Sequence, residues 1–593
     1  MRVKTGRRSI GVNFDKNGVA EIAIWAPLAH KVSIVLEDGK IDLINENRYW
    51  KSITKEIQPG TRYKISIDDL DPLPDPASLS QPEGVHGSSE AINLNVFRWS
   101  DSSWKNIPLE KYIIYELHTG TFSPEHNFEG IIKKIPHLLD LGITAIEIMP
   151  VGQFPGDRNW GYDGVYPFAV QHSYGGAQAL QKLVDECHKN NIAVVLDVIY
   201  NHIGPEGNYL AQFAPYFTGK YKTPWGQALN FDDAWCDGVR EYFIENVLMW
   251  FRDFHIDALR MDAVHAIKDL SPTHIVKEIR QHVDELEKNN GRKYYLITEL
   301  DLNDPVFINP YNKGGYGADA QWIDEFHHAL RVTSGQKPEG YYSDFNGIEH
   351  LAKSYNDAYV YDGQYSLHRK KLFGAKTNNP GRQFVVFSQN HDQTGNRMLG
   401  ERTSQLVSME MCKLLAAAVI VSPYIPMLFM GEEWAEPHPF LFFISHTDEK
   451  LAALVNKGRK EEFSYFNWQG EPPDPRLEKT FTDSMLQWDL LNNVTHKSMF
   501  GYYKKLIALR KTLPALANTD RKKTLAEADV ETKILKLQRW SDEQRLECFL
   551  NFSDKDQPVP LAAAKQYKKI FDSSGSPSDQ LIRAESIIIF ERR

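Results

Sequence analysis

The sequence is poor in cysteine, and its few cysteines form no pattern. Only four occur in 593 residues, and no two of them are spaced as a CxxC pair. Disulfide frameworks and zinc ribbons need several cysteines at short intervals. We therefore expect free thiols in a reducing cytoplasm, with neither a disulfide scaffold nor a cysteine metal site.

Long hydrophobic segments are also missing. No apolar run approaches the roughly 18 residues that span a bilayer, and no apolar stretch follows the basic residues 1–8, as a secretory signal requires. The net charge of -10 argues against nucleic acid or an anionic membrane as partner. No HExxH motif occurs, and the histidines His327 and His328 are adjacent, so zinc is not expected.

The chain is too long for one core, and its patterns divide it in three. Residues 1–95 carry short β runs, such as 20–27 and 31–36, and predict an N-terminal β-sandwich of immunoglobulin-like, carbohydrate-binding type. Residues 511–593 return to short strands (533–538, 547–551, 568–571 and 586–590) and predict a C-terminal β-sandwich.

Between these parts, residues 96–510 alternate strand and helix. Helices fit 128–140, 177–189, 238–254 and 272–288, and strands fit 112–117, 145–149, 192–198, 256–261, 294–298, 320–323, 383–388 and 426–430. Eight such strands predict an α/β fold, a (β/α)8 TIM barrel with insertions. A doubly wound sheet is the alternative, but the turn at 118–121 lacks the Gly-rich phosphate loop usual in that fold.

Three acidic residues each follow an apolar, strand-like run. Asp262 follows 256–261, Glu299 follows 294–298, and Asp392 closes the run that begins at 384. Strand ends that carry acids converge at the C-terminal face of a β/α barrel. Converging carboxylates suit glycoside chemistry, in which one carboxylate attacks and another donates a proton.

Neighbouring residues sharpen these roles. Arg260 lies two residues before Asp262, on the same side of the strand, and would keep that carboxylate ionised and nucleophilic. Burial and nearby carboxylates would raise the pKa of Glu299, as a general acid requires. Each residue alone also has an ordinary interpretation: an ion pair at a strand end for Asp262, and a cap of the following loop for Glu299.

Histidines and a tyrosine complete the candidate site. His391 beside Asp392 could hold sugar hydroxyls, with an Asx turn as the alternative. Asp197 and Asn201 could brace a loop so that His202 reaches ligand, although a structural histidine fits equally well. Tyr162, in the loop 160–164, could stack on a pyranose, but loop aromatics more often only pack.

The segments 197–202 and 260–265, Glu299 and the segment 390–392, in this order, resemble the four signature regions of the α-amylase superfamily (glycoside hydrolase family 13). The resemblance implies a retaining mechanism, with Asp262 as nucleophile, Glu299 as acid/base and Asp392 stabilising the distorted sugar. It also implies that Tyr162 stacks on the attacked sugar. The substrate-binding candidates around these acids are Tyr162, Asp163, His202, Arg260, His265, His391, Gln393 and Asn396.

Further segments resemble the members of the superfamily that release trehalose. They are the linker 75–87, with a mild departure at 79–80, and the segments 301–305, 318–330 and 430–443. The resemblance implies hydrolysis of the α-1,4 bond next to the terminal trehalose of maltooligosyltrehalose, in a pathway beside maltooligosyltrehalose synthase. The acceptor-side candidates are Asp324, Glu325, Phe326, His327 and His328.

Rival functions remain. A glycogen branching enzyme would share the fold and the three acids, a debranching enzyme is the third choice, and a catalytically inactive glucan-binding protein could use the same fold. The segment 324–328 argues against branching, and the intact acids argue against an inactive protein. No cofactor is expected, and for the acidic residues Asp232, Asp233 and Asp237 a solvated loop is favoured over a calcium site.

Overall fold

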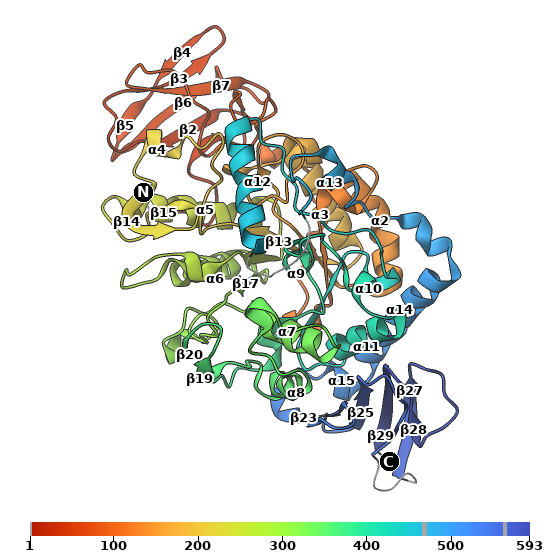
Figure 1. Cartoon of the computed structure of the whole chain (residues 1–593). Coiled ribbons are helices and arrows are strands. Elements are labelled where there is room, and N and C mark those ends of the chain that lie inside the picture. The colour runs from red at the N-terminus through yellow and green to blue at the C-terminus, as the bar shows by residue number, and fades with distance from the viewer. Residues whose placement is uncertain (1–2, 465–470, 561–565, 593) are drawn as a thin grey trace.

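The computed structural model describes residues 3–464, 471–560 and 566–592, and its centre is a closed barrel (Figure 1). Eight parallel strands close it in the order β10-β13-β16-β17-β18-β21-β22-β9. Their bounds are β9 (Ile114–Leu117), β10 (Ala145–Ile148), β13 (Ala193–Val198), β16 (Ala258–Met261), β17 (Tyr295–Glu299), β18 (Ala320–Trp322), β21 (Phe384–Val386) and β22 (Ile425–Phe429). The predicted TIM barrel is confirmed.

Helices lie between the strands and cover them. They are α2 (Phe128–Leu141), α3 (Gly176–Lys189), α5 (Cys236–Asp253), α6 (Ile275–Asn290), α7 (Asp324–Thr333), α8 (Ile348–Asp357), α11 (Met409–Ile420) and α14 (Val494–Thr512). In α2 the Asn127 side chain accepts from the Gly130 N–H at the N-cap, and Gly142 ends the helix at a φ of 97°. These are the usual start and stop devices of an amphipathic helix, whose apolar side is buried here.

The lower half of the barrel is filled with apolar side chains. Ile114, Val195, Ile297, Val385 and Met427 belong to one buried cluster inside the strands. Polar side chains occur in the barrel interior closer to the carboxyl ends of the strands, where Glu116, Glu147 and Arg260 are all buried. The barrel is therefore a packed core at one end and carries its chemistry at the other.

Antiparallel sheets flank the barrel at both ends of the chain, which Figure 1 shows in red and in dark blue. The N-terminal pair has the orders β1-β2-β6-β5 and β4-β3-β7-β8, and the C-terminal sheet has the order β23-β24-β25-β29-β27, beside the pair β26-β28. The flanking sheets confirm the predicted architecture, while the divisions after residues 95 and 510 stay predictions. Their bounds are β1 (Gly11–Phe14), β2 (Ala20–Trp25), β3 (Val32–Leu36), β4 (Gly39–Asp42), β5 (Ile44–Glu46), β6 (Tyr49–Thr54), β7 (Arg62–Ile67), β8 (Ser89–Glu90), β23 (Thr524–Asp529), β24 (Ile534–Trp540), β25 (Arg545–Asn551), β26 (Gln557–Pro558), β27 (Tyr567–Asp572), β28 (Leu581–Ile582) and β29 (Ser586–Arg592).

Insertions between barrel elements form hairpins and short helices. The hairpins are β11 (Gly152–Gln153) with β12 (Tyr166–Val170), β14 (Phe217–Thr223) with β15 (Gly226–Leu229), and β19 (Asp362–Ser366) with β20 (Lys371–Gly374). The helices are α1 (Thr119–Phe122), α4 (Leu210–Phe213), α9 (His391–Gly395), α10 (Thr403–Leu406), α12 (Glu449–Ser464), α13 (Glu478–Thr482) and α15 (Pro514–Ala517).

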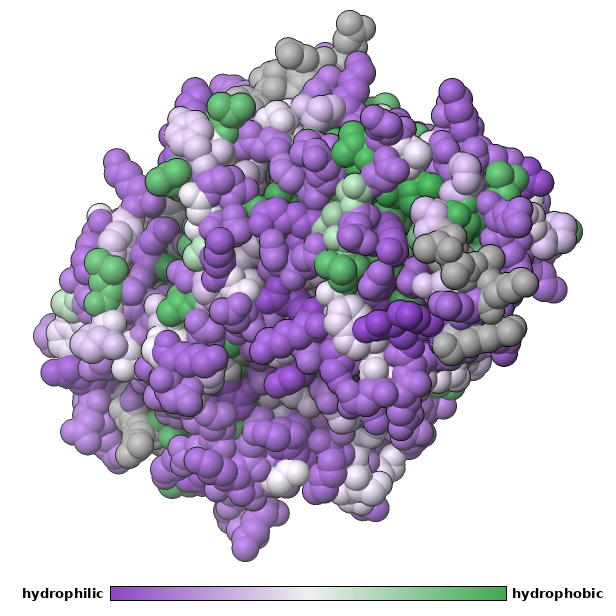
Figure 2. Space-filling view, turned by 90° about the horizontal axis from the view of Figure 1, so that it is seen from below, coloured by the Kyte–Doolittle hydropathy of each residue, from purple (hydrophilic) through white to green (hydrophobic). Residues whose placement is uncertain are grey.

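The outer surface is mainly polar. Figure 2 shows hydrophilic residues over most of one face, with hydrophobic residues in small separate groups. Throughout the described ranges, every helix falls short of the length and apolarity that crossing a membrane requires.

Candidate active site

The three predicted acids lie at the carboxyl ends of barrel strands. Asp262 directly follows β16, Glu299 ends the neighbouring strand β17, and Asp392 lies in α9, after β21. The register pairs Met261 with Thr298, so that Asp262 and Glu299 each occupy the next position on adjacent parallel strands. The fold therefore places these two carboxylates side by side.

Arg260 connects the acids. Its Nη1 donates to both carboxylate oxygens of Asp197 at 3.0 and 2.8 Å and to Asp262 Oδ1 at 2.8 Å, and its Nη2 lies 3.7 Å from Glu299 Oε2. The guanidinium also lies 4.3 Å from the centre of the Trp322 ring. The Arg260 side chain is fully buried, so water screens its attraction to these carboxylates only weakly.

Glu299 has the environment of a carboxylic acid that keeps its proton. Its Oε2 accepts from the Ala263 N–H at 2.5 Å. Burial raises the pKa of Glu299 well above its ordinary value; Arg260 opposes this rise, and Asp262 adds to it. Glu299 is therefore suited to donate a proton near neutral pH.

A buried chain of polar groups runs beneath the acids. His391 Nδ1 lies 2.6 Å from Glu116 Oε1, and its Nε2 lies 2.7 Å from the Tyr162 hydroxyl, which donates to Asp197 at 2.6 Å. Burial alone would lower the pKa of His391, but Asp392 and Glu116 raise it to about 9. The imidazole is therefore charged at neutral pH, with both ring N–H groups donating.

Asn201 and His202 follow β13 and have different partners. Asn201 Nδ2 donates to both the backbone oxygen and Oδ2 of Asp262, each at 2.8 Å. His202 Nε2 lies 3.1 Å from the Tyr162 carbonyl, and its ring stacks on the half-exposed Trp225 ring at 4.4 Å. Burial lowers the pKa of His202, which favours the neutral imidazole.

The other predicted substrate-binding residues lie around this centre. Asp163 accepts from Asn159 at 2.7 Å, and His265 Nδ1 lies 3.4 Å from the Asp301 N–H. Gln393 accepts from the Tyr342 hydroxyl at 3.0 Å, and Asn396 donates to Asp392 Oδ1 at 3.1 Å. All four remain partly exposed.

The acceptor-side segment 324–328 forms the first turn and a half of α7, which divides its residues between two faces. Asp324, His327 and His328 share a face at the helical spacing. Burial raises the pKa of Asp324 to about 7, and the charge on Asp392 adds to this rise. His327 Nδ1 lies 2.6 Å from the Ser388 carbonyl, and the His328 ring contacts Tyr341 and Tyr342.

Glu325 and Phe326 lie on the other face of α7, and their contacts do not fit the predicted role in substrate binding. Glu325 is buried, with one oxygen accepting from Asn303 at 2.6 Å and the other from the backbone N–H groups of residues 360 and 361. Phe326 is fully buried against Tyr355 and Tyr424. A helix turns these two side chains into the core, whereas the sequence-based prediction treated the whole segment as one binding surface.

Sequence reasoning missed several contributors. Glu116, Trp322 and Trp225 lie on strands or hairpins with no acid motif to mark them, and Asn201 was expected to brace a loop but bonds Asp262 itself. The strand positions of Glu116 and Trp322, polar or aromatic at the end of a buried run, were the available signal.

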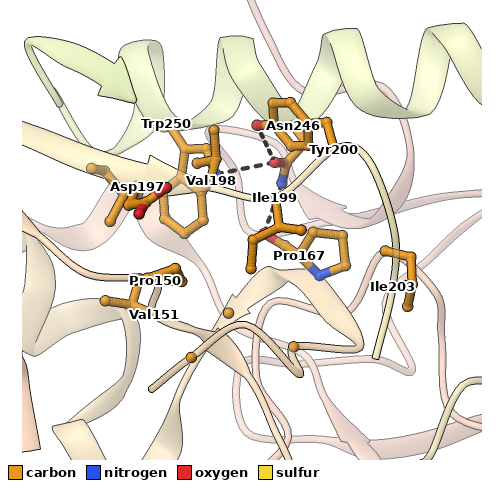
Figure 3. A pocket seen from close by; sticks show the side chains of 14 residues that line it. Pro150, Val151, Pro167, Asp197, Val198, Ile199, Tyr200, Ile203, Asn246 and Trp250 are labelled. Carbon is orange, nitrogen blue, oxygen red and sulfur yellow. Dashed lines mark hydrogen bonds between the residues drawn. The ribbon is translucent and has the colours of Figure 1, made fainter. Parts of the chain in front are cut away.

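A small cavity lies behind the site, between β13, the β12 hairpin and α5 (Figure 3). Its volume is about 30 Å³, and its lining includes Val198, Tyr200, Asn246 and Trp250. Asn246 accepts from Tyr200 at 2.7 Å and from Trp250 at 3.1 Å. The space fits a water molecule and not a sugar, so this cavity is not the substrate-binding site.

The sequence model of the alpha amylase catalytic domain matches residues 98–224 and 228–519. Together with the barrel and its carboxylates, this match defines the class: the chain belongs to the α-amylase family. A crystal structure from Salmonella typhimurium, named as an alpha amylase, has a TM-score of 0.92 and 33% identity and covers 99% of this chain and 100% of its own.

Relatives with higher sequence identity indicate which group within the α-amylase family the chain belongs to. The malto-oligosyltrehalose trehalohydrolase of Saccharolobus solfataricus is 47% identical over 85% of this chain and 87% of its own. That of Arthrobacter ramosus is 41% identical over 83% and 87%. Within the α-amylase family, the chain therefore belongs to the malto-oligosyltrehalose trehalohydrolases, as the sequence motifs predicted.

Proposed function

We propose that this chain hydrolyses the α-1,4 bond next to the terminal trehalose of maltooligosyltrehalose and releases trehalose and a maltooligosaccharide. The observation that carries the proposal is the pair Asp262 and Glu299 on adjacent strand ends, linked by the buried Arg260, in a chain of this family. Two neighbouring carboxyl groups, one ionised and one protonated, are the equipment of a retaining glycosidase.

In the first step Asp262 attacks the anomeric carbon of the donor sugar. Arg260 and Asn201 donate to Asp262, which holds the carboxylate in one orientation. A bond forms between Asp262 and the anomeric carbon while the glycosidic C–O bond breaks. Glu299 gives its proton to the leaving oxygen, so that trehalose departs neutral.

In the second step a water molecule attacks the same carbon from the side that trehalose has left. Glu299, now a carboxylate, takes a proton from this water, and the bond to Asp262 breaks. Asp392 would hold hydroxyls of the donor sugar and stabilise the positive charge that develops on the ring. Both N–H groups of the charged His391 are used by Glu116 and Tyr162, so His391 would support Tyr162 and Asp392 and would not itself hold the sugar. Tyr162 would stack on the same sugar.

Selectivity for the trehalose end would arise on the acceptor side, because the donor sugars are the same as in starch. Asp324 lies close enough to Glu299 to affect its pKa, and His327 and His328 lie on the same face of α7. Polar groups that trehalose satisfies and maltose leaves unpaired would give strong discrimination.

The cellular setting is part of the proposal. The four cysteines, Cys187, Cys236, Cys412 and Cys548, are free, which supports a reducing cytoplasm. Membership of the family supports a pathway that also holds a maltooligosyltrehalose synthase. The side chain of Asp232 is buried and bonds to Lys220 and Tyr221, which supports a structural use of this residue and does not fit the solvated loop favoured from the sequence.

Hydrolysis of maltotriosyltrehalose in water enriched in oxygen-18 tests the proposal. We expect one labelled oxygen at the reducing end of the released maltotriose, first as the α anomer, and no label in trehalose. Label in trehalose would contradict attack at the donor carbon. Longer or branched products without label would identify a transferase such as a branching enzyme.

A further inference from the structure

We propose that Arg459, on the inserted helix α12, is a positioning residue for Asp392 and acts through Asn396; the inference rests on the proposed function. Helix α12 follows the last barrel strand and stands upright, in cyan, in the upper half of Figure 1. Its Arg459 is 63 residues from Asn396 in the sequence and is joined to it by a hydrogen bond.

The Arg459 guanidinium makes two hydrogen bonds to the end of helix α9. Nη1 donates to Asn396 Oδ1 at 3.0 Å, and Nη2 donates to the Gly395 carbonyl at 3.0 Å. Two parallel bonds from one planar guanidinium fix both the side chain of Asn396 and the backbone next to it. A lysine at this position has donors, but its single nitrogen cannot make two parallel bonds of fixed planar geometry.

The hydrogen bonds from Arg459 determine the orientation of the Asn396 side-chain amide. A guanidinium only donates, so the amide oxygen must face Arg459 and the amide nitrogen must face the opposite side. On that side Asn396 Nδ2 donates to Asp392 Oδ1 at 3.1 Å. Without Arg459, the amide is free to turn and to present its oxygen to Asp392, where two acceptors would repel each other.

Asp392 is held by fewer side-chain hydrogen bonds than Asp262. Its side chain is 39% exposed, and its other oxygen lies 3.4 Å from His391 Nε2. Asp262, in contrast, is held by both Arg260 and Asn201. The orientation of the most exposed acid therefore relies on the Asn396 amide.

Packing leaves the Arg459 side of this contact little freedom. The guanidinium lies 4.7 Å from the centre of the Phe442 ring, which packs edge-on against Trp160 at 5.1 Å. A Cβ atom on Gly395 would lie 2.1 Å from the Trp160 ring, so the chain approaches this ring closely where Arg459 grips it. The packed rings of Phe442 and Trp160 thus fix the position of the Arg459 guanidinium relative to helix α9.

A second contact fastens the segment that leads into α12. Glu206, in the loop after β13, accepts from His446 at 3.0 Å and from the Thr447 N–H at 3.1 Å. Glu206 is 6% exposed, so this anchor is buried. The inserted segment is fixed at its start by Glu206 and farther along by Arg459, and it connects the loop after β13 to the end of helix α9, which carries Asp392.

Steady-state kinetics of R459M on maltotriosyltrehalose test the proposal, with K457M as the matched control on the same helix. Among the described residues, Lys457 pairs with Glu461 at 3.7 Å across the exposed helix surface. We expect R459M to lower kcat at least about 10-fold and to change KM less than about 3-fold, because a misaligned Asp392 affects the transition state more than binding. R459K should recover part of the loss, K457M should match the wild type, and the melting temperatures should agree.

A double-mutant cycle separates this route from others. In an N396A background we expect R459M to lower kcat by less than about a further 2-fold, because the hydrogen bond from Asn396 to Asp392 is already lost. Equal costs in both backgrounds, or a rise in KM with kcat unchanged, would overturn the proposal.

A crystal structure of R459M gives a reading that does not depend on activity. We expect the Asn396 amide to leave Asp392, and an unchanged bond between them would overturn the proposal. A wild-type enzyme that releases no trehalose would count against the proposed function instead, and the kinetic comparison would then be made on whichever α-1,4 glucan it cleaves.

Discussion

Replacing Arg260 with methionine removes the cation that bonds both Asp197 and Asp262. Arg260 is fully buried and donates to Asp197 and Asp262, so R260M leaves two carboxylates without their charge partner. Breaking a buried ion pair by removing one partner costs about 3–5 kcal/mol. For a barrel of about 400 residues this corresponds to a fall in melting temperature of about 4–6 °C.

The loss should grow with pH, and its sign follows from Asp197. Burial raises the pKa of Asp197 to about 7, even though Arg260 opposes the rise. A carboxyl whose pKa is raised on folding binds more protons in the folded state, so stability falls as pH rises from the unfolded pKa to the folded one. Without Arg260 the folded pKa is higher still, and this window extends above pH 7.

Differential scanning calorimetry of wild type, R260M and R260K between pH 6 and pH 9 checks this reasoning. We expect the gap between R260M and wild type to widen with pH by up to about 1.4 kcal/mol per pH unit for each carboxyl involved. R260K keeps the charge and should show a smaller and flatter gap. A gap that stays constant or narrows as pH rises would refute the electrostatic account, and trehalose release by R260M near the wild-type rate would refute the role of Arg260 in holding Asp262.

Three further perturbations test other parts of the molecule. E299Q should lower kcat by about 10²–10⁴-fold, since it removes the general acid, and a substrate with an activated leaving group should recover the first step. F326A should cost about 3–5 kcal/mol of stability, as in other buried aromatic truncations, with KM for maltotriosyltrehalose within about 2-fold of wild type. His188 lies 2.8 Å from both Asp101 and Asp257; burial opposes its charge, but Asp257 and Asp101 raise its pKa to about 9. The charged His188 stabilises the folded state through these two carboxylates. This contribution to stability is complete below the unfolded pKa of about 6.5 and is lost as pH rises through about 9, so H188Q should be most destabilising near pH 6.

Each of these expectations has its own contrary result. Failure of an activated substrate to restore the first step in E299Q would argue against the acid role. A large rise in KM for F326A would return Phe326 to the binding surface. A stability loss in H188Q that is the same at pH 6 and pH 10 would show that packing, and not charge, holds that site.

The barrel strands could be predicted because a strand that is buried on both faces of a parallel sheet has a nearly continuous run of apolar residues. All eight predicted segments overlap barrel strands, from 112–117, which contains β9, to 426–430, which shares residues 426–429 with β22. The acids were predictable for the same reason, since Asp262 and Glu299 interrupt such runs where β16 and β17 end. What remained hidden was the pairing between distant segments, such as His391 with Glu116 across 275 residues.

The segment 324–328 shows where pattern reasoning stopped. Its resemblance to the acceptor-side segment of the trehalose-releasing family suggested a binding surface, but the helical period of α7 sends Glu325 and Phe326 inward while Asp324 and His328 stay together. Applying that period to the sequence would have separated the two groups. No such rule finds Arg459, because its contact with Asn396 depends on how the insertion that carries α12 folds back over the barrel.

The central claim is that this chain selects the bond beside a terminal trehalose. An internal competition tests it most directly: equal concentrations of maltotriosyltrehalose and maltopentaose in one reaction, followed by chromatography, give the ratio of the two kcat/KM values. We expect trehalose and maltotriose to accumulate while maltopentaose stays nearly intact. Consumption of both substrates at similar rates would contradict the claim and would leave a general α-1,4-glucan hydrolase.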